Sequence, residues 1–367
     1  MQVPFFDYPR HYTDNRESLI GIFDEVCSRG AFIMQADVER FERNLADYCK
    51  AGFAIGVGNA TDGLELSWMA MDIPAGGEVI VSAHTMLATA SAVKIAGGVP
   101  VPVDIGEDGL IDPDRIEAAI GPRTVGIMPT QLNGRVCQMD RINQIAEKHG
   151  LVIVEDAAQS LGAKFDGQSA GTFGAASAIS FFPAKTLGSL GDAGAVLTNS
   201  DRVADIVFQL HDHGRNKAGV VKRWGRNSRL DNLQAAFLAD GLRSYDDKIK
   251  RRRQVASLYQ DLLGDVSELH LPPSPDSDPR RFDVFQNYEL TAERRDDLVA
   301  FLKSKGVGTL IQWGGLALSD FPMLDVSQPL PRTKEFFQRC VMLPMNTFVS
   351  DDQVLYVANT IKEFYSK

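Results

Sequence analysis

Short apolar runs alternate with segments of helical periodicity between about residues 35 and 200. The runs are rich in Val and Ile, and the segments between them repeat apolar residues every three or four positions. Strands of this kind are buried on both faces, which is typical of a mostly parallel sheet covered by helices. The pattern predicts a layered α/β domain. The predicted strands are 53–59, 78–83, 99–105, 124–130 and 151–157, and the predicted helices are 60–73, 85–97 and 139–150.

The pattern changes after about residue 235. A long helical stretch at 232–263 is followed by a polar, proline-rich loop at 272–279. We therefore predict a large domain at 1–240, which includes the N-terminal segment, and a small C-terminal α+β domain at 241–367. The elements predicted beyond the loop are strands at 284–290 and 307–313 and helices at 294–306, 333–343 and 351–365.

The chain is acidic: it has 38 Lys and Arg residues and 48 Asp and Glu residues, which gives a formal net charge of −10. This disfavours a nucleic-acid-binding protein but leaves room for a local basic pocket. The four cysteines are far apart and show no metal-site spacing, so we expect no metal. The sequence shows no signal-peptide pattern and no run of about 18 apolar residues, so we expect a cytoplasmic protein without a membrane partner.

Asp156 ends the apolar run "LVIVEDA" and would lie at the carboxyl end of a buried strand. Open α/β sheets bind their ligands at that edge. A buried carboxylate there needs a cationic partner, because an unpaired one is costly to bury. A helix N-cap is the alternative, since Asp is common at that position.

Lys185 lies in "SFFPAKTLGSLGDAGAV", a run of aromatic, small and glycine residues. Apolar surroundings disfavour the ammonium form and lower the pKa of a lysine, which leaves a nucleophilic amine for carbonyl chemistry. The glycines that follow allow the backbone to pass close to a ligand. A surface lysine or a buried ion-pair partner is the alternative.

The turn "GVGNATDG" at 56–63 joins a predicted strand to a predicted helix. Its backbone amides and the Thr61 hydroxyl would face an anion at the helix N-terminus, unless Thr or Asn merely caps the helix. A lysine amine suits an aldehyde, an aspartate suits a protonated ring nitrogen, and a helix N-terminus suits a phosphate. Pyridoxal 5′-phosphate carries all three groups.

Three motifs occur in order along the chain: "VEDAAQSLGA" at 154–163, "SFFPAKTLGSLGDAGAV" at 180–196 and "RNSRLDNLQAA" at 226–236. Together they resemble the DegT/DnrJ/EryC1/StrS family of sugar aminotransferases, a branch of the fold-type I pyridoxal-phosphate enzymes. The resemblance runs from "VPFFD" near the start to "LPMNTFVSDDQ" near the end. It implies an aspartate aminotransferase-like fold with a mostly parallel mixed sheet in the large domain. It also implies a homodimer with shared active sites.

The resemblance implies a role for each matching residue. Lys185 would be the catalytic residue, which binds the cofactor aldehyde as a Schiff base and later moves the proton between cofactor and sugar carbons. Asp156 would pair with the pyridine nitrogen, and Gln159 would contact the ring 3-hydroxyl. The residues expected to bind the phosphate are Thr61, Asp62, Ser180 and, from a second subunit, Asn227.

The chain departs from the family pattern at three places. Met86 stands where the family usually stacks an aromatic ring on the cofactor, and His84 would help there. "QLNG" at 131–134 replaces the usual "HLYG", and "IQWGGLALSDF" at 311–321 replaces a segment that contains "HYP". Both segments face the substrate in the family, so these departures bear on substrate choice. The candidate substrate residues are His84, Gln131, Asn133, Gln312 and Trp313.

The resemblance implies an aminotransferase that moves the amino group of L-glutamate to a nucleotide-linked keto-sugar. The product would be an amino sugar for a cell-surface polysaccharide, such as lipopolysaccharide O-antigen, or a related glycan. Two alternatives stay open: a keto-sugar acid without a nucleotide, and a regulatory protein that binds pyridoxal phosphate without turnover. Sugar dehydratases of the family carry histidine in place of the lysine, so Lys185 argues against that activity.

Overall fold

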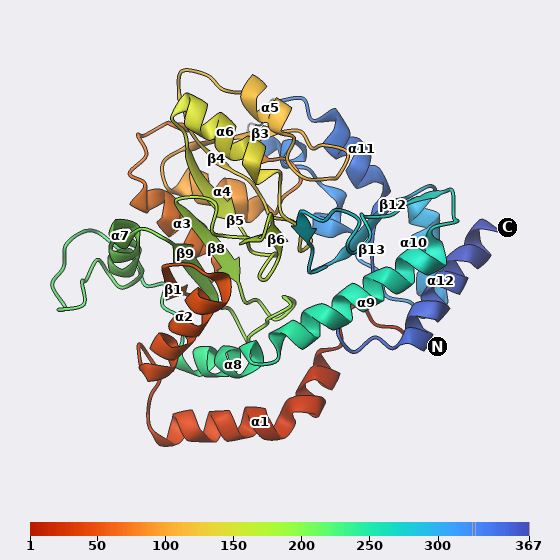
Figure 1. Ribbon diagram of the computed structural model, residues 1–367, viewed down its shortest axis with the longest axis horizontal. Helices are drawn as coiled ribbons and strands as arrows, with labels where there is room; N and C mark the ends of the chain where they lie inside the picture. Colours follow the sequence, from red (N-terminus) through yellow and green to blue (C-terminus); the bar gives the residue numbers. More distant parts are fainter. Residues whose placement is uncertain (325, 327, 367) are drawn as a thin grey trace.

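The computed structural model describes residues 1–324, 326 and 328–366 (Figure 1). A seven-stranded sheet runs through the larger part of the molecule in the order β1-β9-β8-β5-β4-β2-β3. The strands from β8 to β3 are parallel, whereas β9 is antiparallel to both β8 and β1. The predicted mostly parallel mixed sheet is confirmed. Its strands are β1 (Phe53–Val57), β2 (Glu78–Ser82), β3 (Val99–Val103), β4 (Thr124–Met128), β5 (Val152–Asp156), β8 (Ala176–Ser180) and β9 (Gly194–Thr198).

Helices cover both faces of this sheet, because its strands are apolar on both faces. Val79 and Val81 pack with α3 and α4 on one side, while Ile80 between them packs in the core on the other side, with α2, α6 and α8. No helix in the described part of the chain is both long enough and apolar enough to span a membrane. The helices of this part are α1 (Tyr8–Ser28), α2 (Ala36–Cys49), α3 (Ala60–Ala70), α4 (Leu87–Ile95), α5 (Pro113–Ala118), α6 (Met139–His149), α7 (Asp201–His211) and α8 (Asn232–Leu242).

A second hydrophobic core lies at the other end of the molecule, around the antiparallel sheet β10-β12-β13 (Figure 1). A further small sheet, in the order β11-β6-β7, pairs residues from both halves of the chain. The elements are β6 (Lys164–Phe165), β7 (Gln168–Ser169), β10 (Leu269–His270), β11 (Arg281–Phe282), β12 (Tyr288–Ala292), β13 (Cys340–Leu343), α9 (Tyr245–Leu263), α10 (Arg295–Ser304), α11 (Pro331–Arg339), α12 (Asp351–Tyr365) and the 3-10 turns η1 (Gln312–Gly315), η2 (Leu318–Asp320) and η3 (Pro322–Leu324).

Helix α9 joins the two cores. Figure 1 shows α9 running from beneath the large sheet to the second core. Its first residue, Tyr245, packs in the core of the large sheet, and its last residue, Leu263, packs in the second core. Val3, near the start of the chain, also packs in the second core. The boundary at 240/241 therefore stays a prediction, and packing crosses it at α9 and at the N-terminal segment.

Three predicted elements differ from the structure. The helical stretch 232–263 is two helices, because the chain leaves helical geometry between α8 and α9. Residues 307–313 form only isolated bridges, at Val307 and Leu310, before η1 begins. Residues 340–343 continue the predicted helix 333–343 in the sequence pattern but form strand β13, which is buried throughout and paired with β12. A short apolar run fits a helix end as well as a strand, so pairing with a neighbouring strand decides which of the two structures forms.

Candidate active site

Asp156 is the last residue of β5 and lies at the carboxyl edge of the parallel strands, where it is 4% exposed. Its Oδ2 accepts a hydrogen bond of 2.6 Å from the Thr89 hydroxyl, and its Oδ1 accepts one of 3.1 Å from the Ala158 amide. The Thr85 hydroxyl lies 2.6 Å from that of Thr89 and supports it. Burial raises the pKa of Asp156, whereas these hydrogen bonds and the charge of Lys185 lower it. The carboxylate is thus held in one orientation.

Lys185 follows β8, the parallel neighbour of β5, in a turn closed by a hydrogen bond of 2.8 Å from its amide to the Phe182 carbonyl. Burial lowers the pKa of Lys185 to about 8, and the carboxylate of Asp156 acts against this shift. The predicted lowering of the lysine pKa is therefore present in the structure. The two side chains that the motifs single out act on one another electrostatically, as one site requires.

The backbone on both sides of Lys185 is held by a single side chain, that of Gln286. Its Oε1 accepts a hydrogen bond of 2.9 Å from the Thr186 amide, and its Nε2 donates one of 3.0 Å to the Ala184 carbonyl. Gln286 comes from the segment just before β12. The second core therefore helps to fix the position of the lysine.

The N-terminus of α3 meets the end of β8 in a tight corner. A Cβ atom on Gly194, which pairs with Ser180, would lie 2.6 Å from the main chain of Asn59, so only glycine permits this approach. Asn59 caps α3 by accepting a hydrogen bond of 2.8 Å from the Asp62 amide. The Thr61 amide is in the first turn of α3, where amides have no acceptor within the helix, so it is available to an anion. A role of Thr61 and Ser180 in binding a phosphate stays a prediction.

Asp62 and Asn227 are placed differently from the other predicted phosphate residues. The Asp62 carboxylate accepts a hydrogen bond of 2.7 Å from the Ser228 hydroxyl and pairs with Arg226 at 3.2 Å. Its amide is bonded to the helix cap, so Asp62 has its own partners within the chain. Asn227 lies exposed on the surface, paired with Asp212. The roles of both residues toward a phosphate stay predictions.

Gln159 belongs to a cluster of amide side chains beyond Asp156. Its Oε1 accepts hydrogen bonds from the Asn133 main-chain amide at 3.0 Å and from Asn287 Nδ2 at 3.3 Å. Asn287 Nδ2 also lies within donating distance of Asn133 Oδ1, at 2.8 Å, and of Gln312 Oε1, at 3.3 Å. The segments "QLNG" and "IQWGG", which leave the family pattern, therefore meet in one network.

The other candidate residues differ in accessibility. Gln131 has no exposed surface, and its Nε2 donates a hydrogen bond of 2.8 Å to Glu155. His84 is 1% exposed and packs edge-on against Trp313, with 5.4 Å between ring centroids. Met86, by contrast, is 54% exposed where α4 begins. Their contacts with cofactor or substrate stay predictions.

Sequence reasoning missed Thr89, Asn287 and Glu289, all of which contact predicted site residues. Thr89 could have been found from the helical spacing that places it one turn after Thr85. Asn287 and Glu289 interrupt the apolar run "VFQNYEL", and polar residues inside a buried strand call for partners. Nothing in the sequence indicates which partners these are.

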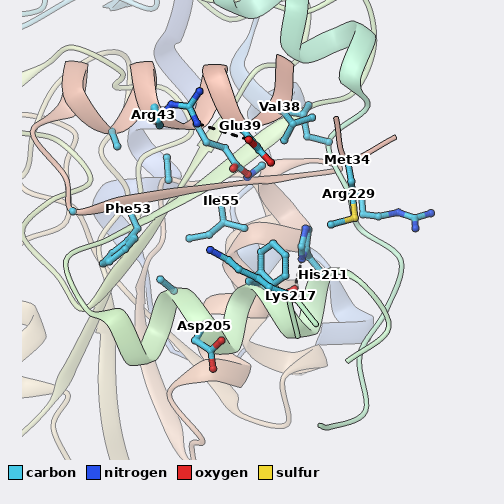
Figure 2. A pocket seen from close by; sticks show the side chains of 18 of the residues that line it. Met34, Val38, Glu39, Arg43, Phe53, Ile55, Asp205, His211, Lys217 and Arg229 are labelled. Carbon is cyan, nitrogen blue, oxygen red and sulfur yellow. Dashed lines mark hydrogen bonds and ion pairs between the residues drawn. The ribbon is translucent and has the colours of Figure 1, made fainter. Parts of the chain in front are cut away.

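A large groove of about 860 Å³ lies elsewhere, between α2, β1 and α7 (Figure 2). Its lining includes Glu39 and Arg43 of α2, 3.8 Å apart, and Lys217 and Arg229 from the loop that follows α7. None of the residues predicted to bind the cofactor lines this groove. It adjoins the loop that carries Asn227, a position that bears on assembly.

Residues 13–362 match the model of the DegT/DnrJ/EryC1/StrS aminotransferase family. The chain belongs to this family. It is 36% identical over 370 residues to a pleiotropic regulatory protein of Geobacillus stearothermophilus, with 100% of this chain and 99% of that protein covered. It is 34% identical over 369 residues to the dTDP-3-amino-3,4,6-trideoxy-alpha-D-glucose transaminase of Streptomyces venezuelae, with 99% and 96% covered. The solved structure of S. venezuelae DesV with a ketimine intermediate matches with a TM-score of 0.95 at 34% identity, over 100% and 99% of the two chains.

The predicted fold type and enzyme class are confirmed: the protein is a sugar aminotransferase of the DegT/DnrJ/EryC1/StrS family and uses pyridoxal 5′-phosphate. The side chains present fit this cofactor. Asp156 offers a buried carboxylate to a protonated ring nitrogen, and Lys185 offers an amine with a lowered pKa. The corner at Thr61 and Ser180 offers amide and hydroxyl donors to a phosphate.

Proposed function

We propose that this family member transfers the amino group of L-glutamate to a nucleotide-linked keto-sugar, with pyridoxal 5′-phosphate held between Asp156 and Lys185. The observation that carries the proposal is the electrostatic interaction of these two residues, one at the end of β5 and the other in the turn that follows its parallel neighbour β8. The likeness to the S. venezuelae transaminase along almost the whole chain supports the substrate class. A keto-sugar acid without a nucleotide is the competing substrate.

The bound cofactor would supply an electron sink, because its protonated ring nitrogen draws electrons from the carbon that bears the amino nitrogen. Asp156 would keep that nitrogen protonated, since a buried charge pair is stronger than an exposed one. Thr89 and Ala158 each bind one carboxylate oxygen and prevent its rotation. Gln159 would donate from Nε2 to the ring oxygen, because its Oε1 is already bonded to the protein.

Lys185 would move the proton in both halves of the exchange. A pKa of about 8 leaves a usable neutral fraction at neutral pH, so the amine can take a proton from the substrate carbon and return it later. L-Glutamate would leave as 2-oxoglutarate in the first half, and the keto-sugar would leave as the amino sugar in the second. Gln286 keeps the lysine backbone in place throughout.

The proposal includes a homodimer with shared sites. The loop between α7 and α8 projects from the body of the molecule (Figure 1), and on it Trp224 is 95% exposed and Val221 is 63% exposed. Exposed apolar side chains that lie together are typical of interaction surfaces. Asn227 lies on the same loop, from which it would reach a phosphate held by a second subunit. Asn227→Ala should then weaken cofactor binding, which a spectroscopic titration measures, and a fully active monomer would contradict the shared site.

One relative is named a regulatory protein, so a regulator without turnover is the second candidate. Lys185, Asp156 and Gln159 would bind the cofactor in either case. Turnover with glutamate distinguishes the two functions. A cytoplasmic location, and a role of the product in lipopolysaccharide O-antigen or another cell-surface polysaccharide, stay predictions.

The decisive experiment has two steps. The holoenzyme is first treated with L-glutamate, which should remove the visible band of the lysine-bound cofactor and release 2-oxoglutarate. The resulting pyridoxamine form is then mixed with dTDP-, UDP- and GDP-linked 3- and 4-keto-sugars and with a free keto-sugar acid, and recovery of the band identifies the substrate. A band that glutamate leaves unchanged would favour the regulator. Recovery with the free acid alone would contradict the nucleotide-linked substrate.

A further inference from the structure

Glu289 lies on β12 in the second core, yet its carboxyl reaches two loops of the large sheet. The side chain is 2% exposed. Its Oε2 accepts a hydrogen bond of 2.6 Å from Asn133 Nδ2 and lies 3.4 Å from His84 Nε2. One carboxyl oxygen thus links both loops to β12.

The Glu289 carboxyl lies beside the His84 ring. The Nδ1 atom of His84 is 2.9 Å from the Gly109 carbonyl, which can only accept, so Nδ1 carries the ring hydrogen. The Nε2 atom of the neutral ring is then an acceptor, and it makes no hydrogen bond with the described residues. Burial lowers the pKa of His84 to about 4, so the ring is neutral at neutral pH, and burial raises the pKa of Glu289 to about 7, so the carboxyl is neutral in about half of the molecules.

Oε2 of Glu289 therefore accepts from Asn133 in either protonation state. When the carboxyl is protonated on Oε2, His84 Nε2 offers an acceptor for the hydrogen, and a lone pair remains for Asn133. When the carboxyl is ionised, the lone pairs of Oε2 are all available. The acceptor at His84 thus favours donation away from Asn133.

The direction of this hydrogen bond decides how the neighbouring amides are turned. Because Glu289 accepts, Asn133 presents Nδ2 to it and Oδ1 to Asn287. Asn287 must then present Nδ2, which faces the Oε1 atoms of Gln159 and Gln312. A side-chain amide has nearly the same shape when it is turned by 180°, so a single orientation of all these amides requires a group of fixed direction at each end of the network. The second fixed group is the Asn133 main-chain amide, which cannot turn and donates to Gln159 Oε1 at 3.0 Å.

This order leaves amide donors free at the far end. Gln312 is 2% exposed, and its Nε2 has no partner among the described residues. A buried donor without a partner is costly, and a ligand oxygen would remove that cost. If the amides were reversed, Gln159 and Gln312 would present carbonyl oxygens, which would repel the oxygens of a ligand.

We propose that Glu289 is a positioning residue that acts through Asn133 and Asn287 and turns Gln159 and Gln312 so that both offer N–H groups to ligand oxygens. Gln159 would serve the ring oxygen of the cofactor, and Gln312 would serve an oxygen of the substrate. The inference rests on the proposed function, which supplies the ligands. It explains why amide residues stand in both segments that leave the family pattern.

The amides have room to turn when the anchor is lost. A cavity of about 360 Å³ is lined by His84, Asn133, Asn287 and Glu289, among others. Glu289→Leu removes the acceptor and keeps most of the side-chain volume. Asn133 is then free to turn, and Gln159 no longer offers its donor consistently to the ring oxygen.

The test uses the holoenzyme with Glu289→Leu, Asn287→Leu and the double variant. A donor to the ring oxygen stabilises its anionic form, so loss of the donor raises the pH at which the visible band of the lysine-bound cofactor changes. We expect a rise of about one pH unit for each single variant. The transition pH of the double variant should rise no further than that of each single variant, because both substitutions break the same chain of hydrogen bonds from Glu289 to Gln159 and Gln312. An additive double variant, or an unchanged band in Glu289→Leu, overturns the proposal.

Asp283→Asn is the matched control. Asp283 is also a buried carboxyl at the junction with the second core, but it pairs with Arg135 at 3.3 Å and not with this chain of hydrogen bonds. It should lower the melting temperature without moving the transition of the visible band. An equal shift in this control would reduce Glu289 to a general structural role and overturn the proposal. Loss of the wild-type reaction with glutamate would instead contradict the proposed function, so the two failures are distinguishable.

Discussion

The carboxyl edge of β5 and β8 and the junction with β12 hold their functional groups by different means. At the edge, one carboxylate and one amine interact electrostatically; the carboxylate ends β5 and the amine stands in the turn after β8. At the junction, neutral amides from four segments are connected to one carboxyl from the second core. The edge provides the chemistry that every substrate needs. Under the proposed function, the junction would provide the directional contacts that distinguish one substrate from another.

The two regions also differ in how they should respond to substitution. A buried charge interacts over several ångströms, so its loss slows every reaction step in which charge develops nearby. An amide network depends on which atom of each hydrogen bond donates and which accepts. A reversed amide costs more binding energy than a missing one, because it places two acceptors or two donors against each other. The following predictions separate these two kinds of dependence, from the largest effect to the smallest.

Lys185→Ala should abolish the visible band and lower turnover by roughly three orders of magnitude or more, because it removes both the anchor and the proton carrier. Absorbance and single-turnover kinetics with glutamate measure this. The melting temperature of the apo-protein should change little, since Lys185 makes no side-chain hydrogen bond within the described chain. A band that persists would mean that another lysine holds the cofactor.

Asp156→Asn should lower turnover by about a hundredfold, because an amide stabilises the protonated ring nitrogen far less than a carboxylate does. The band should remain, since Lys185 is still present. Steady-state kinetics with glutamate provide the measurement. A rate close to that of the wild type would remove Asp156 from its assigned role.

Asn287→Asp should lower kcat/KM for the keto-sugar by roughly tenfold to thirtyfold, and more than Asn287→Leu does. Aspartate can only accept, so it faces the oxygens of Asn133, Gln159 and Gln312 with another oxygen. Leucine removes the donor without reversing it. If the leucine variant is the weaker enzyme, packing rather than direction governs the junction.

The rate at which pyridoxal phosphate adds to the apo-protein should rise about tenfold from pH 7 to pH 9 and then level off. Only the neutral amine attacks an aldehyde, and a pKa of about 8 gives a neutral fraction of about one tenth at pH 7 and about nine tenths at pH 9. An unshifted lysine would show a rise of about a hundredfold without levelling. In Asp156→Asn the plateau should begin at lower pH, because the carboxylate that raises the lysine pKa is gone. Stopped-flow absorbance follows both rates.

The sequence predicts the edge far better than the junction. Asp156 ends an unbroken apolar run and Lys185 stands in an apolar, glycine-rich run, so each can be recognised from its immediate neighbours. Gln131 shows the limit of such reasoning, because an unusual polar residue in a loop proves to bind Glu155 inside the protein. Glu289 and Asn133 are far apart in the sequence, and only the folded chain shows that they meet.

The same limit applies to the fold. Strands β1 to β5 of the large sheet follow from local apolar runs, because each is buried on both faces, whereas β8 and β9 were not predicted. The residues of β13 fit a helix end equally well until β12 pairs with them. Local periodicity misassigned this element because its identity depends on a distant partner.

The position of Val3 has a consequence for how the protein is made. Its amide donates to the Gly306 carbonyl at 2.9 Å and its carbonyl accepts from Gly308 at 2.8 Å, within a core that also contains Phe364 of α12. The partners of Val3 lie about 300 residues further along the chain, so this pairing can form only after they have been synthesised. Contacts between segments this far apart in the sequence form slowly, so we expect the second core to close later than the large sheet. Asp156 would then reach its final place before Glu289.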